Sequence, residues 1–254
     1  DLLQLAYRQN GRAVEPGRFL YSNTGYLLLV EVLRHVHSAP LQEIAEQHVF
    51  TPLCMSSARF KSDPREVVAS AASSYEPIAT GWSHQQRPVT LPGPGSLWCT
   101  ASDLDRWLGH LWHEWQTAPD GMLPSEQHLR YRLSDHPPFT YGAGLYADPR
   151  PGRSAVFHYG HEQGFSAAAF LASTGNRIVC LSNHAGISAD HVAAAAMADL
   201  TRHPGTDPSQ LLPHVLRTQP VPRSTAADDL DGKQEAPHTP VGTYACGKYR
   251  APCA

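Results

Sequence analysis

Residues 154–182 read SAVFHYGHEQGFSAAAFLASTGNRIVCLS and give the strongest indication of the fold class. Their apolar and β-branched content predicts three strands, at residues 154–159, 165–172 and 177–182. Ser173-Thr174-Gly175-Asn176 between the last two is typical of a tight hairpin turn. An alanine-rich helix is predicted next, from Asp190 to Thr201. Strands that follow one another directly and then a helix predict an antiparallel sheet covered by helices, and therefore an α+β fold with two layers.

Three further helices are predicted upstream of these strands. Apolar residues recur at helical spacing over residues 24–36, and a second helical pattern covers residues 41–52. The third helix begins at a cap formed by Thr100 or Ser102 and carries leucine and tryptophan at helical spacing. Residues 65–95 are rich in proline and glycine and are predicted to form a loop. These helices indicate a mainly helical subdomain beside the sheet.

The composition excludes several classes of function. The chain of 254 residues carries 20 Lys and Arg against 23 Asp and Glu, a net charge of −3, and has no basic run. A nucleic-acid partner is therefore not expected. No apolar run approaches the roughly 20 residues that cross a bilayer, so no transmembrane segment is predicted. Five scattered cysteines without a C-x-x-C pair predict free thiols and neither a disulfide framework nor a zinc site: Cys54, Cys99, Cys180, Cys246 and Cys253.

The C-terminal part of the chain differs in composition from the rest. Residues 203–240 contain seven prolines among small and polar residues, which is typical of a linker. Val241-Gly242-Thr243-Tyr244 then begins a segment, residues 241–254, that is the possible start of a C-terminal β-domain. Residues 1–202 are therefore predicted to form the main domain.

Tyr21-Ser22-Asn23 is the first of two segments that carry candidate chemistry. A tyrosine can act as a general base if neighbouring cations favour its phenolate, and an asparagine offers a donor and an acceptor to a substrate amide. The same segment also reads as an ordinary helix start, with Ser22 or Asn23 as the cap.

His158-Tyr159-Gly160-His161 is the second segment, on a strand predicted to lie at the edge of the sheet. A free strand edge presents backbone N–H groups, and a glycine lets a substrate approach closely. His158 is a candidate to hydrogen-bond a tyrosine or a substrate. With 15 histidines in the chain, a polar strand end with an incidental histidine is the alternative.

The order of these segments resembles the serine β-lactamase and penicillin-binding-protein superfamily, in particular its class C β-lactamase, D,D-peptidase, D-aminopeptidase and esterase branches. The Tyr-Ser-Asn segment resembles the second motif of that family and His158-Tyr159-Gly160 its third. Residues 49–55, VFTPLCM, resemble a helix end that reads F-x-P-L-G-M in the family, with Cys54 in place of a glycine that often needs a positive φ. The glycine-rich segment that ends at Thr100 also resembles the corresponding segment of the family.

The resemblance implies a serine hydrolase that acts on peptide, ester or β-lactam carbonyls through an acyl-enzyme, without cofactor or metal. It implies that Tyr21 is general base and acid, that Asn23 contacts the substrate amide, and that His158 supports Tyr21 and an anionic end of the substrate. Gly160, Ser22 and the backbone N–H of His161 are the candidate substrate and oxyanion residues. The partner is a small molecule or peptide, and a bacterial protein in the periplasm, the medium or the cytoplasm is implied.

The nucleophile of the family, the serine of S-x-x-K, does not occur in this chain. The three lysines, Lys61, Lys233 and Lys248, follow Ala58, Leu230 and Ala245 at the required spacing. We therefore expect a fragment that lacks the N-terminal strands of the sheet and is inactive by itself. The alternative is a catalytically inactive family member that acts as a binding module.

Two other enzyme classes fit the sequence less well. Gly164-Phe165-Ser166-Ala167-Ala168 approximates the nucleophile elbow of a Ser-His-Asp hydrolase, but it lacks the last glycine and leads into a hairpin. Close histidine pairs such as His158 and His161 could indicate a metal enzyme, but none has H-E-x-x-H spacing.

Overall fold

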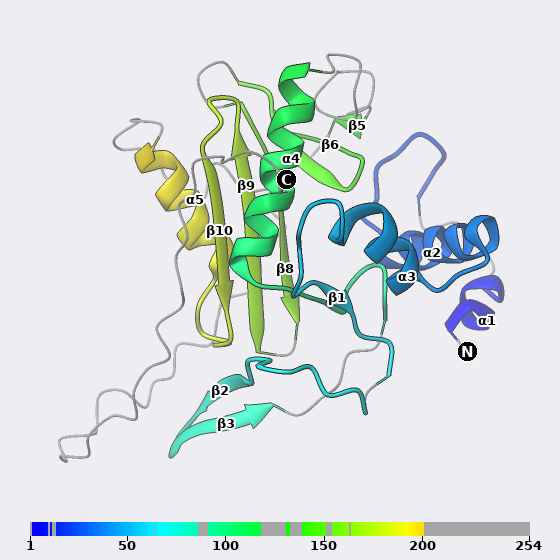
Figure 1. Ribbon diagram of the computed structural model, residues 1–254, viewed down its shortest axis with the longest axis horizontal. Coiled ribbons are helices and arrows are strands. Elements are labelled where there is room, and N and C mark those ends of the chain that lie inside the picture. Colours follow the sequence, from blue (N-terminus) through cyan, green and yellow to red (C-terminus); the bar gives the residue numbers. More distant parts are fainter. Residues whose placement is uncertain are drawn as a thin grey trace.

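The computed structural model describes residues 2–9, 11, 14–63, 65–85, 91–117, 131–132, 139–150, 154–162 and 164–200. A six-stranded sheet lies at its centre, with the order β10-β9-β8-β7-β6-β5 and antiparallel pairing throughout (Figure 1). The strands are β5 (Tyr131–Arg132), β6 (Thr140–Gly142), β7 (Leu145–Asp148), β8 (Ala155–Glu162), β9 (Phe165–Ala172) and β10 (Arg177–Ser182). The predicted α+β class and the predicted strands β8 to β10 are confirmed, whereas β5 to β7 were not predicted.

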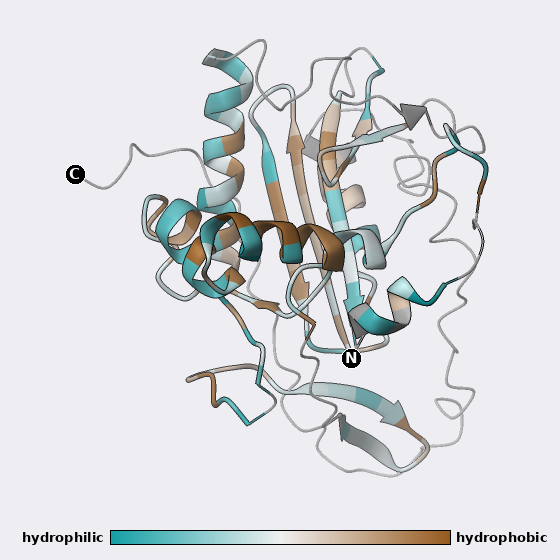
Figure 2. Ribbon diagram, turned by 90° about the vertical axis from the view of Figure 1, so that its right-hand side faces the viewer, coloured by the Kyte–Doolittle hydropathy of each residue, from teal (hydrophilic) through white to brown (hydrophobic). Residues whose placement is uncertain are grey.

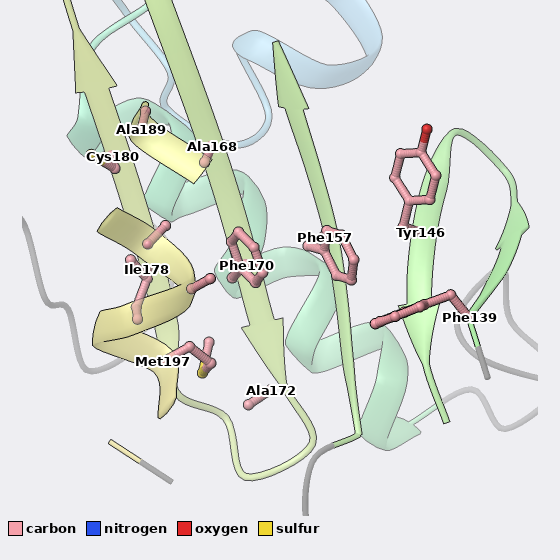
Figure 3. Packing of buried hydrophobic residues seen from close by; sticks show 12 residues of the cluster. Phe139, Tyr146, Phe157, Ala168, Phe170, Ala172, Ile178, Cys180, Ala189 and Met197 are labelled. Carbon is pink, nitrogen blue, oxygen red and sulfur yellow. The ribbon is translucent and has the colours of Figure 1, made fainter. Parts of the chain in front are cut away.

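Side chains alternate between the two faces along each strand, so both faces of the sheet carry apolar residues. A helix packs on each of these faces. Helix α4 (Ala101–Thr117) packs on the face that carries Val156, Leu171 and Val179. Helix α5 (Ala189–Leu200) covers the other face, which carries Phe157 and Phe170 and which Figure 3 shows from close by. These two phenylalanine rings stack with centroids 4.7 Å apart and an angle of 6°.

The first part of the chain is helical, and the two helices predicted over residues 24–36 and 41–52 are confirmed, whereas the short helix α1 was not predicted. It contains α1 (Leu2–Tyr7), α2 (Asn23–His37), α3 (Leu41–Ala45) and a π-helical turn, η1 (Glu46–Phe50). A small core of Ala45, Phe50, Met55 and Ala58 holds α3 and η1 together. Cys54 ends this unit with φ of 55°, which is the left-handed conformation expected at that position. Glycine adopts this conformation without strain, whereas a residue with a side chain adopts it at a cost.

Helix α2 contacts α1, α3 and two turns of the rest of the molecule. A Cβ atom added at Gly144, in the turn between β6 and β7, would lie 2.7 Å from the Tyr26 hydroxyl oxygen. A Cβ atom added at Gly93 would lie 2.6 Å from Val30 Cγ2, so both turns approach α2 closely. The ribbon of the helix is largely hydrophobic in Figure 2, and the helix carries five large apolar side chains that are exposed: Leu28, Leu29, Val32, Leu33 and Val36. No residue of α2 is fully buried.

The prediction of a loop over residues 65–95 was wrong in part. Residues 74–85 form a hairpin of β2 (Ser74–Ile78) and β3 (Gly81–Gln85), which projects from the end of the sheet (Figure 1). Polar β-strands with a proline at position 77 do not show the apolar alternation that predicts strands. Two short strands, β1 (Arg59–Phe60) and β4 (Leu97–Trp98), pair on either side of this region.

Thr100 is the residue that caps α4, because its Oγ1 accepts a hydrogen bond from the backbone N–H of Asp103. Cys99 and Cys180 are free thiols, as predicted, but Cys54 is disulfide-bonded, so the prediction of free thiols was wrong for this residue. The predicted linker at 203–240 and the segment 241–254 lie outside the described residues. Among the described helices, none is both long and apolar enough to cross a membrane.

Candidate active site

Tyr21 and His158, far apart in the sequence, lie next to each other in the fold. Their ring centroids are 6.0 Å apart with an angle of 37° between the rings. Tyr21 directly precedes Ser22, whose Oγ accepts the backbone N–H of Gly25 at 3.0 Å and caps α2. The cap fixes the start of the helix, so Tyr21 is held at the position where α2 meets β8.

A group of tyrosines surrounds this pair. Tyr141 packs edge-on against Tyr21 with centroids 6.0 Å apart, and Tyr146 lies 5.7 Å from the His158 ring. The hydroxyls of Tyr26 and Tyr141 are 3.4 Å apart. The Tyr159 hydroxyl donates to that of Tyr146 at 3.5 Å. The residues around Tyr21 are therefore aromatic rings with hydroxyl groups, supplied by α2, β6, β7 and β8.

This environment favours the neutral forms of both candidate residues. Burial raises the pKa of the Tyr21 phenol, and the nearby Tyr26 raises it further. Burial lowers the pKa of His158, and a backbone hydrogen bond with Tyr159 opposes this effect without cancelling it. Both shifts follow from the cost of placing a charge where water is partly excluded. A phenol at position 21 and a neutral imidazole at position 158 are the expected forms at neutral pH.

The prediction of an edge strand at His158 was wrong for β8 as a whole. β8 is an inner strand that pairs with β9 along its full length and with β7 over Ala155–Phe157. Beyond Phe157, no described strand pairs with β8 on the β7 side. The end of β8, residues 158–162, is therefore open on one side. A free strand edge was predicted for this segment, and it exists at this end of β8 only.

The backbone of His161 faces the open side of β8. The backbone N–H of Ser173 donates to the carbonyl of Ser154 at 2.8 Å, so this pair exchanges hydrogen bonds between the two strands. In an antiparallel pair, hydrogen-bonded positions alternate with positions that point the other way. By this alternation Gly160 bonds to β9, and His161 directs its N–H and C=O away from β9. The His161 N–H is therefore available to a ligand, and its role as an oxyanion donor stays a prediction.

The remaining predicted residues lie close to the same place. Ser22 and Asn23 are exposed at the start of α2, and no described residue forms a hydrogen bond with the Asn23 side chain. Gly160 is exposed, and a Cβ atom added to it would have no other atom within 4 Å. Gly160 therefore leaves space above the strand, which is compatible with close approach of a substrate.

Two acidic side chains at this end of β8 were not predicted from the sequence. Asp190, in the first turn of α5, is only 1% exposed and accepts from His161 Nε2 at 3.4 Å. Glu162 accepts from the backbone N–H of Ser96, and a Cβ atom added at Gly95 would lie 3.1 Å from Glu162 Oε1. Strand alternation placed His161 and Glu162 on opposite faces, but no sequence pattern indicated which segments would meet them.

No group of three or more His, Cys, Asp or Glu side chains in the described part of the chain is arranged to hold a metal ion. The chemistry that the described site can offer is proton transfer and hydrogen bonding by Tyr21, His158 and the open edge of β8.

Comparison with known proteins gives consistent results. Residues 5–202 match the family model described as Beta-lactamase. PbpX of Bacillus subtilis (strain 168), named as a penicillin-binding protein, is 24% identical over 168 residues, which are 66% of this chain and 40% of PbpX. The octameric penicillin-binding protein homologue from Pyrococcus abyssi has a TM-score of 0.62 at 22% identity, over 84% of this chain and 50% of that one.

A D-stereospecific amidohydrolase from Streptomyces sp. has a TM-score of 0.61 at 17% identity, over 81% of this chain and 60% of that one. At these identities the solved structures establish a shared fold. The chain thus spans about half the length of the relatives that it matches.

Proposed function

Because the chain belongs to the beta-lactamase family, we propose that it supplies the tyrosine and histidine side of a serine hydrolase active site. The reaction would be the hydrolysis of a peptide, ester or β-lactam carbonyl through an acyl-enzyme. The observation that carries this proposal is the contact between the Tyr21 and His158 rings, 6.0 Å apart, beside the open edge of β8.

In this proposal Tyr21 takes the proton of the attacking serine hydroxyl and later returns it to the leaving group. The environment described above keeps Tyr21 a phenol, because its pKa is raised by burial. The step therefore needs a cation beside the phenol to lower that pKa. A lysine of an S-x-x-K motif would supply it. Lys61, the one lysine among the described residues, lies with Nζ 6.0 Å from the Trp98 ring centroid instead.

His158 and β8 have supporting roles in the proposal. The neutral His158 imidazole would form one hydrogen bond with Tyr21 or with the substrate, as donor or as acceptor. The N–H of His161 would donate to the oxygen of the tetrahedral intermediate, where the negative charge develops. Asn23, exposed at the start of α2, would bind the amide of the substrate, with Ser22 holding the helix start in place.

Since the chain contains no S-x-x-K, we propose that these 254 residues alone do not hydrolyse substrate. The same fact, together with the protonated state expected for Tyr21, favours a second candidate function, a binding module that holds D-peptide or amide ligands without turnover. Similarity to penicillin-binding proteins and to a D-stereospecific amidohydrolase supports a D-configured acyl compound as the ligand in either case.

A binding and activity experiment on the whole chain tests both parts. We expect no hydrolysis of 4-nitrophenyl acetate above the rate in buffer. We expect N-acetyl-D-phenylalanine amide to shift the NMR signals of the backbone amides at residues 158–162, and Tyr21→Phe to weaken this binding. Tyr7→Phe is the matched control, because Tyr7 is 69% exposed on α1. Ester hydrolysis that Tyr21→Phe abolishes would refute the inactivity, and ligand shifts confined to other parts of the fold would refute the site.

A further inference from the structure

We propose that the open end of β8 selects substrates that carry a free amine and disfavours substrates that carry a carboxylate. This inference rests on the proposed function, because it takes the open edge at His161 as the place where the substrate carbonyl binds. The preference for an amine is set by the charges next to that edge. It differs from the expectation, drawn from the family resemblance, that His158 supports an anionic end of the substrate.

Glu162 is the first of these charges. Side chains alternate along a strand, so Glu162 shares its face of β8 with His158 and Gly160. The turn at Gly95 and Ser96 fixes its carboxylate, because the Ser96 N–H donates to it and Gly95 lies against it. Partial burial raises the pKa of this carboxyl. No described residue forms an ion pair with Glu162, so a ligand ammonium is a suitable partner for its charged form.

Asp190 is the second charge, on the other face of the same strand end. Burial alone would raise the pKa of its carboxyl, but hydrogen bonds from His161 and from the Ser188 hydroxyl outweigh burial and hold the pKa below its ordinary value. Oδ2 of Asp190 has no hydrogen-bond partner. Oδ1 of Asp190 lies 3.4 Å from Nε2 of His161, and since a carboxylate only accepts hydrogen bonds, this contact is favourable when Nε2 carries a proton. The Asp190–His161 pair is then neutral or singly negative, and is not positive in either state.

The described cations do not balance these charges. Burial lowers the pKa of His158, which keeps this residue uncharged at neutral pH. Lys61 lies beside the turn that contacts Glu162, because its backbone N–H donates to the Ser96 carbonyl at 3.0 Å, but its Nζ lies 6.0 Å from the Trp98 ring centroid and it forms no ion pair with Glu162. Six arginines already pair with carboxylates elsewhere: Arg34, Arg59, Arg65, Arg106, Arg150 and Arg177. Arg8, Arg18 and Lys61 form no ion pair with a described carboxylate. Of these three, Arg18 is exposed and lies three residues before Tyr21 in the sequence, so it is the cation that could still favour an anionic ligand.

The size of the expected preference follows from the exposure of Glu162. Ion pairs between partly exposed groups are weak, because water and salt screen them. We therefore expect a ligand with an ammonium group to bind about threefold to fivefold more tightly than a neutral ligand of the same shape. Added salt should reduce this ratio.

The experiment compares three ligands that differ in charge, by NMR titration of the whole chain. They are D-phenylalanine amide, its neutral N-acetyl derivative and N-acetyl-D-phenylalanine, whose free carboxylate is anionic. At about pH 6.5 the α-amine is mainly protonated, since its ordinary pKa is about 7.7. We expect the amine to bind most tightly and the carboxylate most weakly. Glu162→Gln should abolish the preference for the amine, and Glu43→Gln, at an exposed position on α3, should preserve it.

The outcomes separate this inference from the proposed function. Binding of the neutral ligand at residues 158–162 without any preference for the amine would overturn the inference and leave the proposed function standing. Tighter binding of the carboxylate, lost in Arg18→Ala, would also overturn the inference. Failure of all three ligands to bind at this strand end would overturn both.

Discussion

Removing the carboxylate of Asp105 is expected to destabilise the fold by about 3 kcal/mol. Asp105 on α4 binds Arg177 on β10 through two hydrogen bonds, Nε to Oδ1 at 2.7 Å and Nη2 to Oδ2 at 3.2 Å. Arg177 is only 3% exposed, and Asp105 is 22% exposed. Asp105→Ala removes this carboxylate from a buried guanidinium, and breaking a buried ion pair by removing one partner costs about 3–5 kcal/mol. Because water reaches Asp105 in part, we expect the lower end of this range.

Urea unfolding followed by tryptophan fluorescence measures this effect, since α4 carries Trp107, Trp112 and Trp115. The matched control is Glu31→Ala, which removes the exposed ion pair with Arg34 and should cost less than about 0.5 kcal/mol. Replacing both partners, as Arg177→Met with Asp105→Leu, should recover most of the stability, because no buried charge is left unpaired. A loss in Asp105→Ala no larger than that in Glu31→Ala would show that the buried Arg177 does not depend on Asp105.

Three further effects can be measured with the same unfolding assay. Phe170→Ala should cost about 4 kcal/mol, because Phe170 is 1% exposed and stacks on Phe157, and a loss below about 1 kcal/mol would contradict the packing. Ser38→Gly should stabilise by about 1 kcal/mol, because Ser38 ends α2 with φ of 52°, and destabilisation would contradict that conformation. Burial raises the pKa of Tyr141 and Tyr146 above the ordinary value of about 10. The folded state therefore holds these two protons more tightly, and the stability present below about pH 10 should fall as the pH rises beyond it, whereas a flat alkaline profile would contradict this burial.

The sequence predicted the long helices α2, α4 and α5 and the strands β8 to β10 of the fold. β9 and β10 were found at the predicted residues because their apolar content and the turn at residues 173–176 are local signals. β6 and β7 were missed because they have three and four residues, too short for a periodic pattern to appear.

What the sequence could not predict is how distant segments meet. Asp190 meets His161 because α5 begins beside this end of β8, and Glu162 lies against Gly95 because of the position of β8 in the sheet. Both contacts depend on tertiary packing, which no local sequence pattern indicates. The open side of β8 has the same origin, because it exists only where β7 ends before β8 does.

The proposed site depends on the contact between Tyr21 and His158, and nuclear Overhauser effects between their ring protons detect this contact. With ring centroids 6.0 Å apart, we expect cross-peaks between the two rings and further cross-peaks from Tyr21 to Tyr141. A His158 ring that shows cross-peaks only to interior residues, and none to Tyr21, would mean that the two segments do not form one site.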